Sequence, residues 1–359
     1  MKKLLSFTIL AAMIVFAACE NTIKYEYDKD DGEITVLGQL STADTLHAIY
    51  LSMSYPDRTE PLPKAKVECF VNGERSIAEE IPVSTDETYI SHYYTEYVFN
   101  AVFRPGDKVR IEASAGGQNA WTESVVPDPG VIIAVDTASV VKSMVEGGDT
   151  YDKEYMELKV RLSDVKGSEN YFTLDPEMSV VETLSSGRGE VTDVFFNGPS
   201  HIDYDTFHDL ILEDGYSSGL GDLFEDLMPV NSMHCFSDKA FRDSEATVRM
   251  YVTSDHFRAG SGSYYQYYTH YFEIAAKVEV ERTLHISFKT FDRDFYNYLR
   301  ALNNFRCYGY DVEPIIEPTM LPNNVNGGMG MVSVMAESRV DLKLPKETFI
   351  RGKSYPVYD

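Results

Sequence analysis

Residues 64–71, Lys-Ala-Lys-Val-Glu-Cys-Phe-Val, run directly into Asn72-Gly73 and form the clearest secondary-structure signal in the sequence. Apolar and polar side chains largely alternate along them, which is the period of a half-buried β-strand. Asn-Gly favours a tight hairpin turn, because both residues adopt positive φ with little strain. The stretch therefore predicts a strand that turns back into an antiparallel partner.

Further short strands are predicted on both sides of this hairpin. They cover residues 33–40, 47–53, 93–103, 107–113 and 120–126. About seven strands at this spacing indicate a β-sandwich of immunoglobulin-like or prealbumin-like type. Residues 127–130, Pro-Asp-Pro-Gly, end the pattern. We therefore expect residues 33–126 to form a sandwich with its own core, whose strands do not interleave with those of the later chain.

Residues 131–359 predict a larger domain that is also rich in strands. Strand-like patterns recur at residues 131–135, 156–162, 171–174, 246–253, 264–280, 283–289, 331–334 and 338–344. A helix is predicted at residues 292–305, where Phe295, Tyr298, Leu299 and Leu302 follow one another at helical spacing on one apolar face. The fold class is therefore expected to be mainly β, with one helix packed against the second domain.

The net charge of the chain limits its partners. It is −25, and removing Lys2 and Lys3 with the leader described below gives −27. Nucleic-acid binding requires a basic surface that displaces counterions from phosphates, so the charge argues against this class of function. It argues equally against attachment to anionic lipid through surface charge. An acidic surface suits solubility, or the capture of cations and cationic peptides.

Besides Cys19, the sequence contains Cys69, Cys235 and Cys307. An odd number cannot all pair internally, and none of them stands in a CxxC metal-binding spacing. A disulfide between Cys235 and Cys307 is one interpretation, and three buried free thiols is the other.

The N-terminus has the layout of an export signal. Lys2 and Lys3 precede an apolar run at residues 4–16, and Ala17-Ala18 stand directly before Cys19. This run is too short to cross roughly 30 Å of hydrocarbon as a helix. The ending resembles the lipobox of bacterial lipoproteins, although Phe16 departs from the usual aliphatic residue. We predict a signal peptide at residues 1–18 and a lipid on Cys19; an ordinary secretory signal with an incidental cysteine is the alternative.

Residues 19–32 are polar and acidic and predict a flexible tether between the lipid and the folded body. Acidic residues directly after a lipidated cysteine resemble a surface-display signal of Bacteroidetes-type bacteria, and Glu20 and the acidic residues at 28–31 fit it. A plain linker is the alternative. We expect an outer-membrane lipoprotein that faces the cell exterior.

Several motifs in the mature chain resemble one family. They are Tyr296-x-Tyr298-Leu299, Glu317-Pro318, the run Pro-Asn-Asn-Val-Asn-Gly-Gly-Met-Gly at residues 322–330, Phe236-Ser237-Asp238-x-x-Phe241, and Ala65-x-Val67 with the later Val126-Pro127. Together they resemble the DUF4249 family of Bacteroidetes lipoproteins, a domain of unknown function. The resemblance implies a surface or outer-membrane lipoprotein encoded with a SusC-like TonB-dependent transporter. It carries over no catalytic residues.

Sequence motifs of hydrolases, nucleotide-binding loops and dinucleotide-binding folds are absent, and no cofactor is predicted. Asp203, Asp205, His208 and Asp209 form an acidic loop that could ligate a hard cation such as Ca²⁺. However, His208 stands where an EF-hand requires glycine, and a solvated acidic loop is the alternative.

Tyr264, Tyr265, Tyr267 and Tyr268 form the most suggestive surface candidate. Tyrosine offers a rigid amphipathic face to a ligand or a protein partner at low entropic cost. The alternative is an aromatic core on one face of a strand with cross-strand pairs on the other. Gly327-Gly328-x-Gly330 precedes a strand rather than a helix, so it predicts a backbone bend or bulge and not a phosphate loop.

These observations predict a non-catalytic accessory or cargo-binding partner of a TonB-dependent nutrient uptake system. The alternatives are a structural or adhesive surface lipoprotein, pilus-like or matrix-binding, and an enzyme whose site the sequence does not reveal. A pocket that gathers two carboxylates, or a histidine beside a nucleophile, would revive the enzyme hypothesis in the folded protein. We expect the second domain to dock the partner, because it holds the tyrosine run and the acidic residues at 184–226. The cargo is left open.

Replacing Cys19 by Ala tests the lipobox interpretation. The variant should leave the membrane fraction or accumulate as uncleaved precursor, because the acyl chains, each methylene of which contributes about 0.8 kcal/mol, are its anchor. Metabolic labelling with a palmitate analogue measures this directly. Absence of label on the wild-type protein would show that Cys19 is not lipidated.

Overall fold

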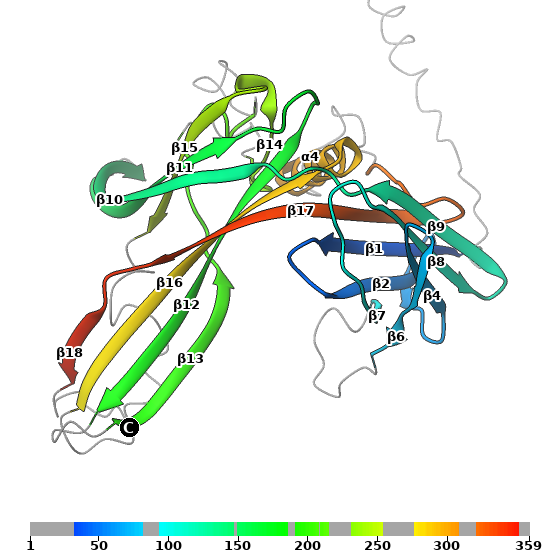
Figure 1. Ribbon diagram of the computed structural model, residues 1–359, viewed down its shortest axis with the longest axis horizontal. Coiled ribbons are helices and arrows are strands. Elements are labelled where there is room, and N and C mark those ends of the chain that lie inside the picture. Colours follow the sequence, from blue (N-terminus) through cyan, green and yellow to red (C-terminus); the bar gives the residue numbers. More distant parts are fainter. Residues whose placement is uncertain are drawn as a thin grey trace, which may run out of the picture.

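The computed structural model describes residues 32–81, 93–146, 149–185, 191–207, 209–214, 231–253, 276–308 and 321–351. Across these ranges the protein is mainly β, as the sequence predicts, and its sheets form two sandwiches side by side (Figure 1). The one α-helix described is α4 (Arg293–Tyr308), which confirms the predicted helix. No described helix has the length and apolar character needed to span a bilayer.

The first sandwich is built from the nine strands that follow the tether. One of its sheets contains β1 (Glu33–Ser41), β2 (Leu46–Ser54), β3 (Thr59–Pro61), β6 (Glu79–Glu80) and β7 (Thr95–Asn100). The other has the order β5-β4-β8-β9 and contains β4 (Lys66–Val71), β5 (Glu74–Ile77), β8 (Lys108–Ala115) and β9 (Gln118–Val125). The predicted hairpin is confirmed as β4 and β5, with both Asn72 and Gly73 at positive φ.

The second sandwich begins after the Pro-Asp-Pro-Gly break. Its smaller sheet contains β10 (Val131–Glu146), β11 (Asp149–Ser163) and β15 (Glu245–Thr253). Its larger sheet contains β12 (Tyr171–Ser185), β13 (Val191–His201), β14 (Cys235–Ser237), β16 (Ala276–Phe291), β17 (Met329–Lys343) and β18 (Glu347–Arg351). Alternate residues of β11, β15, β12 and β16 fill the core between the two sheets.

Strand β17 belongs to both sandwiches. Its first half pairs in parallel with β1, from Thr35↔Met329 to Ser41↔Met335. Its second half pairs antiparallel with β16, from Thr290↔Ala336 to Thr283↔Lys343. In Figure 1 this strand, orange to red, runs from one sandwich into the other. The prediction that strands of 33–126 do not interleave with later ones is therefore wrong: one continuous sheet of eleven strands crosses the boundary.

The core of the first sandwich depends on this late segment. Val325, Val332, Val334 and Ala336 are buried in the same cluster as the residues of β1, β2, β4 and β8. A parallel pair needs a long connection, here almost the whole chain, so local alternation of residues cannot reveal the pairing. Residues 33–126 thus lack part of the core that we expected them to supply alone.

The Asn- and Gly-rich run before β17 fixes it in the first sandwich. Asn324 makes two hydrogen bonds to the backbone of Val332, donating to its carbonyl (2.8 Å) and accepting from its N–H (3.0 Å). Asn326 and Trp121 exchange two backbone hydrogen bonds, of 2.9 and 2.7 Å, across to β9. The run is therefore a structural clasp between the two sheets, which agrees with a backbone bend and not with a phosphate loop.

Gly330 permits the close approach of β17 and β1. Its φ is +121°, and a Cβ atom there would lie 2.0 Å from the carbonyl oxygen of Val36. Only glycine meets both conditions, because an L-residue would be strained and would also displace the neighbouring strand.

The linker between the sandwiches is fastened to the second one. The backbone N–H of Gly130 donates to the Thr290 hydroxyl (2.9 Å), and a Cβ at Gly130 would lie 2.4 Å from the ring of Phe288. Phe288 in turn stacks on Phe172 with ring centroids 4.6 Å apart. The Pro-Asp-Pro-Gly segment is thus held by packing and not only by its own turn chemistry.

Replacing Gly330 by Ala tests the close contact of β17 with β1. We expect a loss of about 3 kcal/mol or more of unfolding free energy, because positive-φ strain and overpacking add. Gly73→Ala is the matched control: its φ is +87° but nothing lies within 4 Å of the added Cβ. It should cost only the strain, roughly 1–2 kcal/mol. Urea unfolding followed by circular dichroism measures both, and equal losses would contradict the close approach.

Candidate functional site

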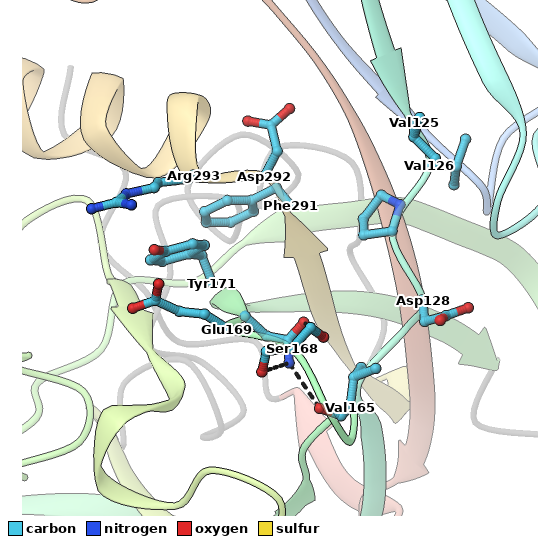
Figure 2. A pocket seen from close by; sticks show the side chains of 12 residues that line it. Val125, Val126, Asp128, Val165, Ser168, Glu169, Tyr171, Phe291, Asp292 and Arg293 are labelled. Atoms are coloured by element: carbon cyan, nitrogen blue, oxygen red, sulfur yellow. Dashed lines mark hydrogen bonds between the residues drawn. The ribbon is translucent and has the colours of Figure 1, made fainter.

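A cavity of about 410 Å³ opens where the two sandwiches meet. One wall is the end of β9 and the linker, with Val125, Val126, Pro127 and Asp128. The other comes from the loop between β11 and β12, the first residue of β12, the last residue of β16 and the start of α4. Figure 2 shows these two walls facing each other. The cavity exists because β17 and the linker hold the sandwiches together here.

The second wall presents two aromatic rings, those of Tyr171 and Phe291 (Figure 2). Tyr171 stacks on Tyr296 with ring centroids 4.6 Å apart, and Phe291 meets Phe295 edge-on at 5.1 Å. Both supporting rings lie on α4, whose apolar face packs here against β17. The helix therefore makes this wall rigid, which lowers the entropic cost of binding a ligand against it.

The charged groups around the cavity are mostly acidic. Three carboxylates, those of Asp128, Glu169 and Asp292, line it together with one guanidinium, that of Arg293. Asp292 also caps α4, accepting a hydrogen bond from the backbone N–H of Phe295 (2.8 Å), and burial raises its pKa. Burial, followed by the charge of Glu169, raises the pKa of Tyr171, so this side chain is a neutral hydroxyl. Glu169 is already paired with Arg242 (3.3 Å) and Asp292 with the N-terminus of α4, so the acidic excess of the lining is small.

Asn170 fixes the loop that forms the base of the cavity. This buried side chain donates to the Asp164 carboxylate (3.1 Å) and to the carbonyls of Val165 (2.9 Å) and Ser168 (3.1 Å). Its backbone N–H donates to Asp238 (3.1 Å), which is fully buried and paired with Arg242 (2.8 Å). The loop is thus preorganised by bonds within the protein.

No histidine or cysteine is among the described residues that line the cavity. The Ser168 side chain, which lines the cavity together with Tyr171, donates its hydroxyl to the side-chain oxygen of Asn170 (3.0 Å). The cavity gathers the carboxylates of Asp128, Glu169 and Asp292, which is one of the two arrangements that support the enzyme hypothesis.

The family model described as "Domain of unknown function (DUF4249)" matches residues 20–340. The chain belongs to this family. A search of curated proteins finds no match. Among solved structures, a DUF4785 family protein from Legionella pneumophila shares 5% identity at a TM-score of 0.20. The match covers 70% of this chain and 51% of that one, so the chain spans about half its length. A likeness this low carries no argument.

The DUF4249 motifs of this chain have structural positions around the site. Phe236 and Phe241 lie in the aromatic core of the second sandwich, and Asp238 holds the cavity loop through Asn170. Tyr296 supports Tyr171 and donates its hydroxyl to Asp214, while Arg300 donates to Tyr296 (2.8 Å). The run 322–330 is the clasp of β17. These motifs build the frame of the cavity and do not themselves carry reactive groups.

The residues that we singled out from the sequence lie elsewhere. Tyr264, Tyr265, Tyr267 and Tyr268 are outside the described residues, as is His208. Asp203 is exposed, and Asp205 accepts from the N–H of Phe207 (2.8 Å). Asp209 accepts from the backbone of Ile211 (3.1 Å) and Arg249 (3.0 Å). Within the described ranges, no group of three or more His, Cys, Asp or Glu is arranged to hold a metal ion.

The structure shows the state of two of the cysteines. Cys69 and Cys235 are buried free thiols, so the Cys235–Cys307 disulfide is not formed. Burial raises the pKa of each of these two thiols to about 12, which makes them unreactive.

The cavity itself was not found from the sequence. It joins three separate segments, residues 125–128, 165–171 and 291–293, and no motif connects them. Two signals were available: the linker at 127–130 and the start of the helix at Asp292. The first indicates a domain boundary and the second the start of a helix, and neither pattern indicates a site.

Proposed function

We propose that this chain is an outer-membrane, surface-exposed lipoprotein that acts without catalysis as an accessory or cargo-binding partner of a SusC-like, TonB-dependent nutrient uptake system of Bacteroidetes. The observation that carries the proposal is the acidic, aromatic cavity at the junction of a long, tethered β body. The lipid at Cys19 supplies the membrane anchor, as the leader predicts.

The position at which the chain enters the folded body supports a tethered arrangement. The Gln118 side chain donates to the carbonyl of Gly32 (2.8 Å), so the entry point lies at the β8–β9 turn of the first sandwich. In the proposed arrangement the predicted tether, residues 19–32, joins the body here, and a flexible segment of that length reaches roughly 20 Å. The first sandwich is thus the part nearest the anchor.

The length of the body supports contact with a partner above the membrane surface. At about 3.3 Å per residue, the 15 residues of β17 span roughly 50 Å. The β16 strand continues past the last pair with β17, from Thr283 to Ala276, and extends the body further. In the proposed arrangement, the junction cavity lies between the anchored end and the distal end of the body, where loops of a membrane barrel would contact it.

The chemistry of the cavity favours a cationic or amphipathic occupant. Its acidic excess attracts positive charge, and Val125, which is 58% exposed, offers apolar area in front of the buried rings of Tyr171 and Phe291. A basic loop of a transporter and a cationic peptide share this chemistry. Two proteins held on one membrane meet at high effective concentration, so the interface does not need to be large.

A structural or adhesive role is the second candidate, and one observation favours it. β13 is an edge strand among the described strands, and Val194 and Phe196 on it are 60% and 69% exposed. Exposed apolar residues on an edge strand invite pairing with another chain. This surface lies on the part of the sheet remote from the anchor.

Site-specific photo-crosslinking in native membranes tests the docking proposal. A photoreactive amino acid at Val125, which lines the cavity and is 58% exposed, should capture a barrel protein. The matched control is Ile77, which is 61% exposed on β5 and does not line the cavity. It should capture none.

The crosslinked product is identified by mass spectrometry after mild detergent extraction. Equal capture from both positions, or no barrel protein from Val125 while surface display is intact, would contradict docking at the cavity. Capture from Phe196 alone, by a chain other than a transporter, would favour the adhesive role.

A further inference from the structure

A serine, a histidine and an aspartate stand in a row on the larger sheet of the second sandwich. Ser179 Oγ lies 2.8 Å from His285 Nε2, and His285 Nδ1 lies 2.7 Å from Asp341 Oδ1. The three residues lie on β12, β16 and β17. Their neighbours Met178, Leu284, Ile286 and Leu342 face the core, so the row lies on the opposite face of the sheet.

The register of the three strands produces this row. His285 pairs directly with Asp341 on β17 and with Glu177 on β12. Ser179 is two residues beyond Glu177, on the same face, and diagonal neighbours of this kind come within reach of a ring side chain. His285 itself is 9% exposed, which limits its freedom to leave the row.

The hydrogen bonds assign the proton positions in the row. The bond from His285 holds the pKa of the Asp341 carboxyl below its usual value, with Arg339 (3.2 Å) acting in the same direction and burial against it. An ionised carboxylate only accepts, so Nδ1 carries the proton and Nε2 presents its lone pair. Ser179 therefore donates its hydroxyl hydrogen to Nε2, which is how a general base activates a serine.

A bulge in β13 lies directly beside Ser179. Met178 pairs with Ser200 and Val180 with Asn197, so β13 contains one extra residue at this point, at Gly198-Pro199. Bulges re-aim side chains and interrupt regular pairing, and they are common next to active sites. Ser179 is half-buried here and not sealed in the core.

We propose that Ser179 is an activated nucleophile for acyl transfer from small, exposed carboxylic esters, with His285 as the base and Asp341 as its positioning residue. This activity goes beyond the binding role proposed above and does not rest on it, and it would add catalysis to a function proposed above as non-catalytic. It also bears on the enzyme hypothesis, because a histidine beside a nucleophile is one of the two arrangements that revive it.

The proposed reaction has two steps. Ser179 Oγ forms a bond to the ester carbonyl carbon while its proton passes to His285 Nε2, and the bond from that carbon to the alcohol oxygen breaks as Nε2 returns the proton to the leaving alcohol. Water then attacks the acyl-serine, gives one proton to Nε2 and releases the carboxylic acid, and Nε2 returns the proton to Ser179. No oxidant or other co-reactant is required.

General-base catalysis of this kind contributes about 10²–10⁴-fold. Dedicated oxyanion donors add about 10²–10³-fold where they are present. Ser179 lies within paired strands, whose backbone N–H groups are largely used by the sheet, so we expect slow turnover. Covalent labelling, which needs only the first attack, is therefore the appropriate measurement.

The mature protein is incubated with a fluorophosphonate probe, and the labelled peptide is located by mass spectrometry. Ser179 Oγ should bond to phosphorus as fluoride leaves and the proton passes to His285. We expect label on the peptide that contains Ser179, none there in Ser179→Ala, and labelling slower by about 10²-fold or more in His285→Gln. Ser287→Ala is the matched control, because its hydroxyl donates to Glu337 (2.6 Å), and its labelling should equal that of the wild type.

The Asp341→Asn variant distinguishes a role of Asp341 in positioning His285 from a role in the stability of the fold. It should slow labelling without lowering the melting temperature, and Asp341→Glu should restore part of the rate. Wild-type labelling no faster than that of His285→Gln, with all variants folded by circular dichroism, would overturn the proposal and leave the row as a cross-strand polar ladder. Label on other serines alone would overturn it as well.

Discussion

The parallel pairing of β17 with β1 is the constraint on which the rest of the structure depends. Seven residues of one strand complete the first sandwich, and the following residues of the same strand complete the second. At the change of partner, the Glu337 carboxylate accepts from Ser41 of β1 (2.9 Å) and from Ser287 of β16 (2.6 Å). A single side chain thus joins the two neighbours of β17. The sandwiches are not separate domains on a hinge but parts of one sheet system.

This continuity explains why a site forms at the junction. The linker is fastened by Gly130 to Thr290 and Phe288, and α4 is packed against Met331 and Met335 of β17. The cavity lies between these two fixed points. Its aromatic wall and its acidic lining are therefore held in place before any ligand arrives, which favours binding by a preorganised surface. The DUF4249 motifs contribute to the clasp, the helix and the loop that create this geometry.

The sequence reveals the parts of the fold that depend on local patterns. The hairpin at Asn72-Gly73, the helix face at Phe295 and Leu299, and the mainly β composition follow from periodicity and turn chemistry. The pairing of Thr35 with Met329 does not, because contact between residues almost three hundred positions apart leaves no local period. The glycines at 327–330 indicate a bend, but the reason for them, the nearby carbonyls of Ile34, Val36 and Asn119, lies on two other strands. Local sequence patterns do not reveal the cavity or the Ser179–His285–Asp341 row for the same reason, since each joins side chains from separate segments.

The central claim is that β17 makes the two sandwiches one cooperative unit, and native-state hydrogen exchange tests it most directly. Peptides that cover residues 33–41 of β1 and 283–291 of β16 are followed by mass spectrometry at increasing urea. If β17 couples the sandwiches, the opening free energies of the two peptides should fall to the same value and follow the same dependence on urea. Exposure of the β1 peptide at clearly lower urea, while the β16 peptide stays protected, would contradict the claim and show that the first sandwich opens on its own.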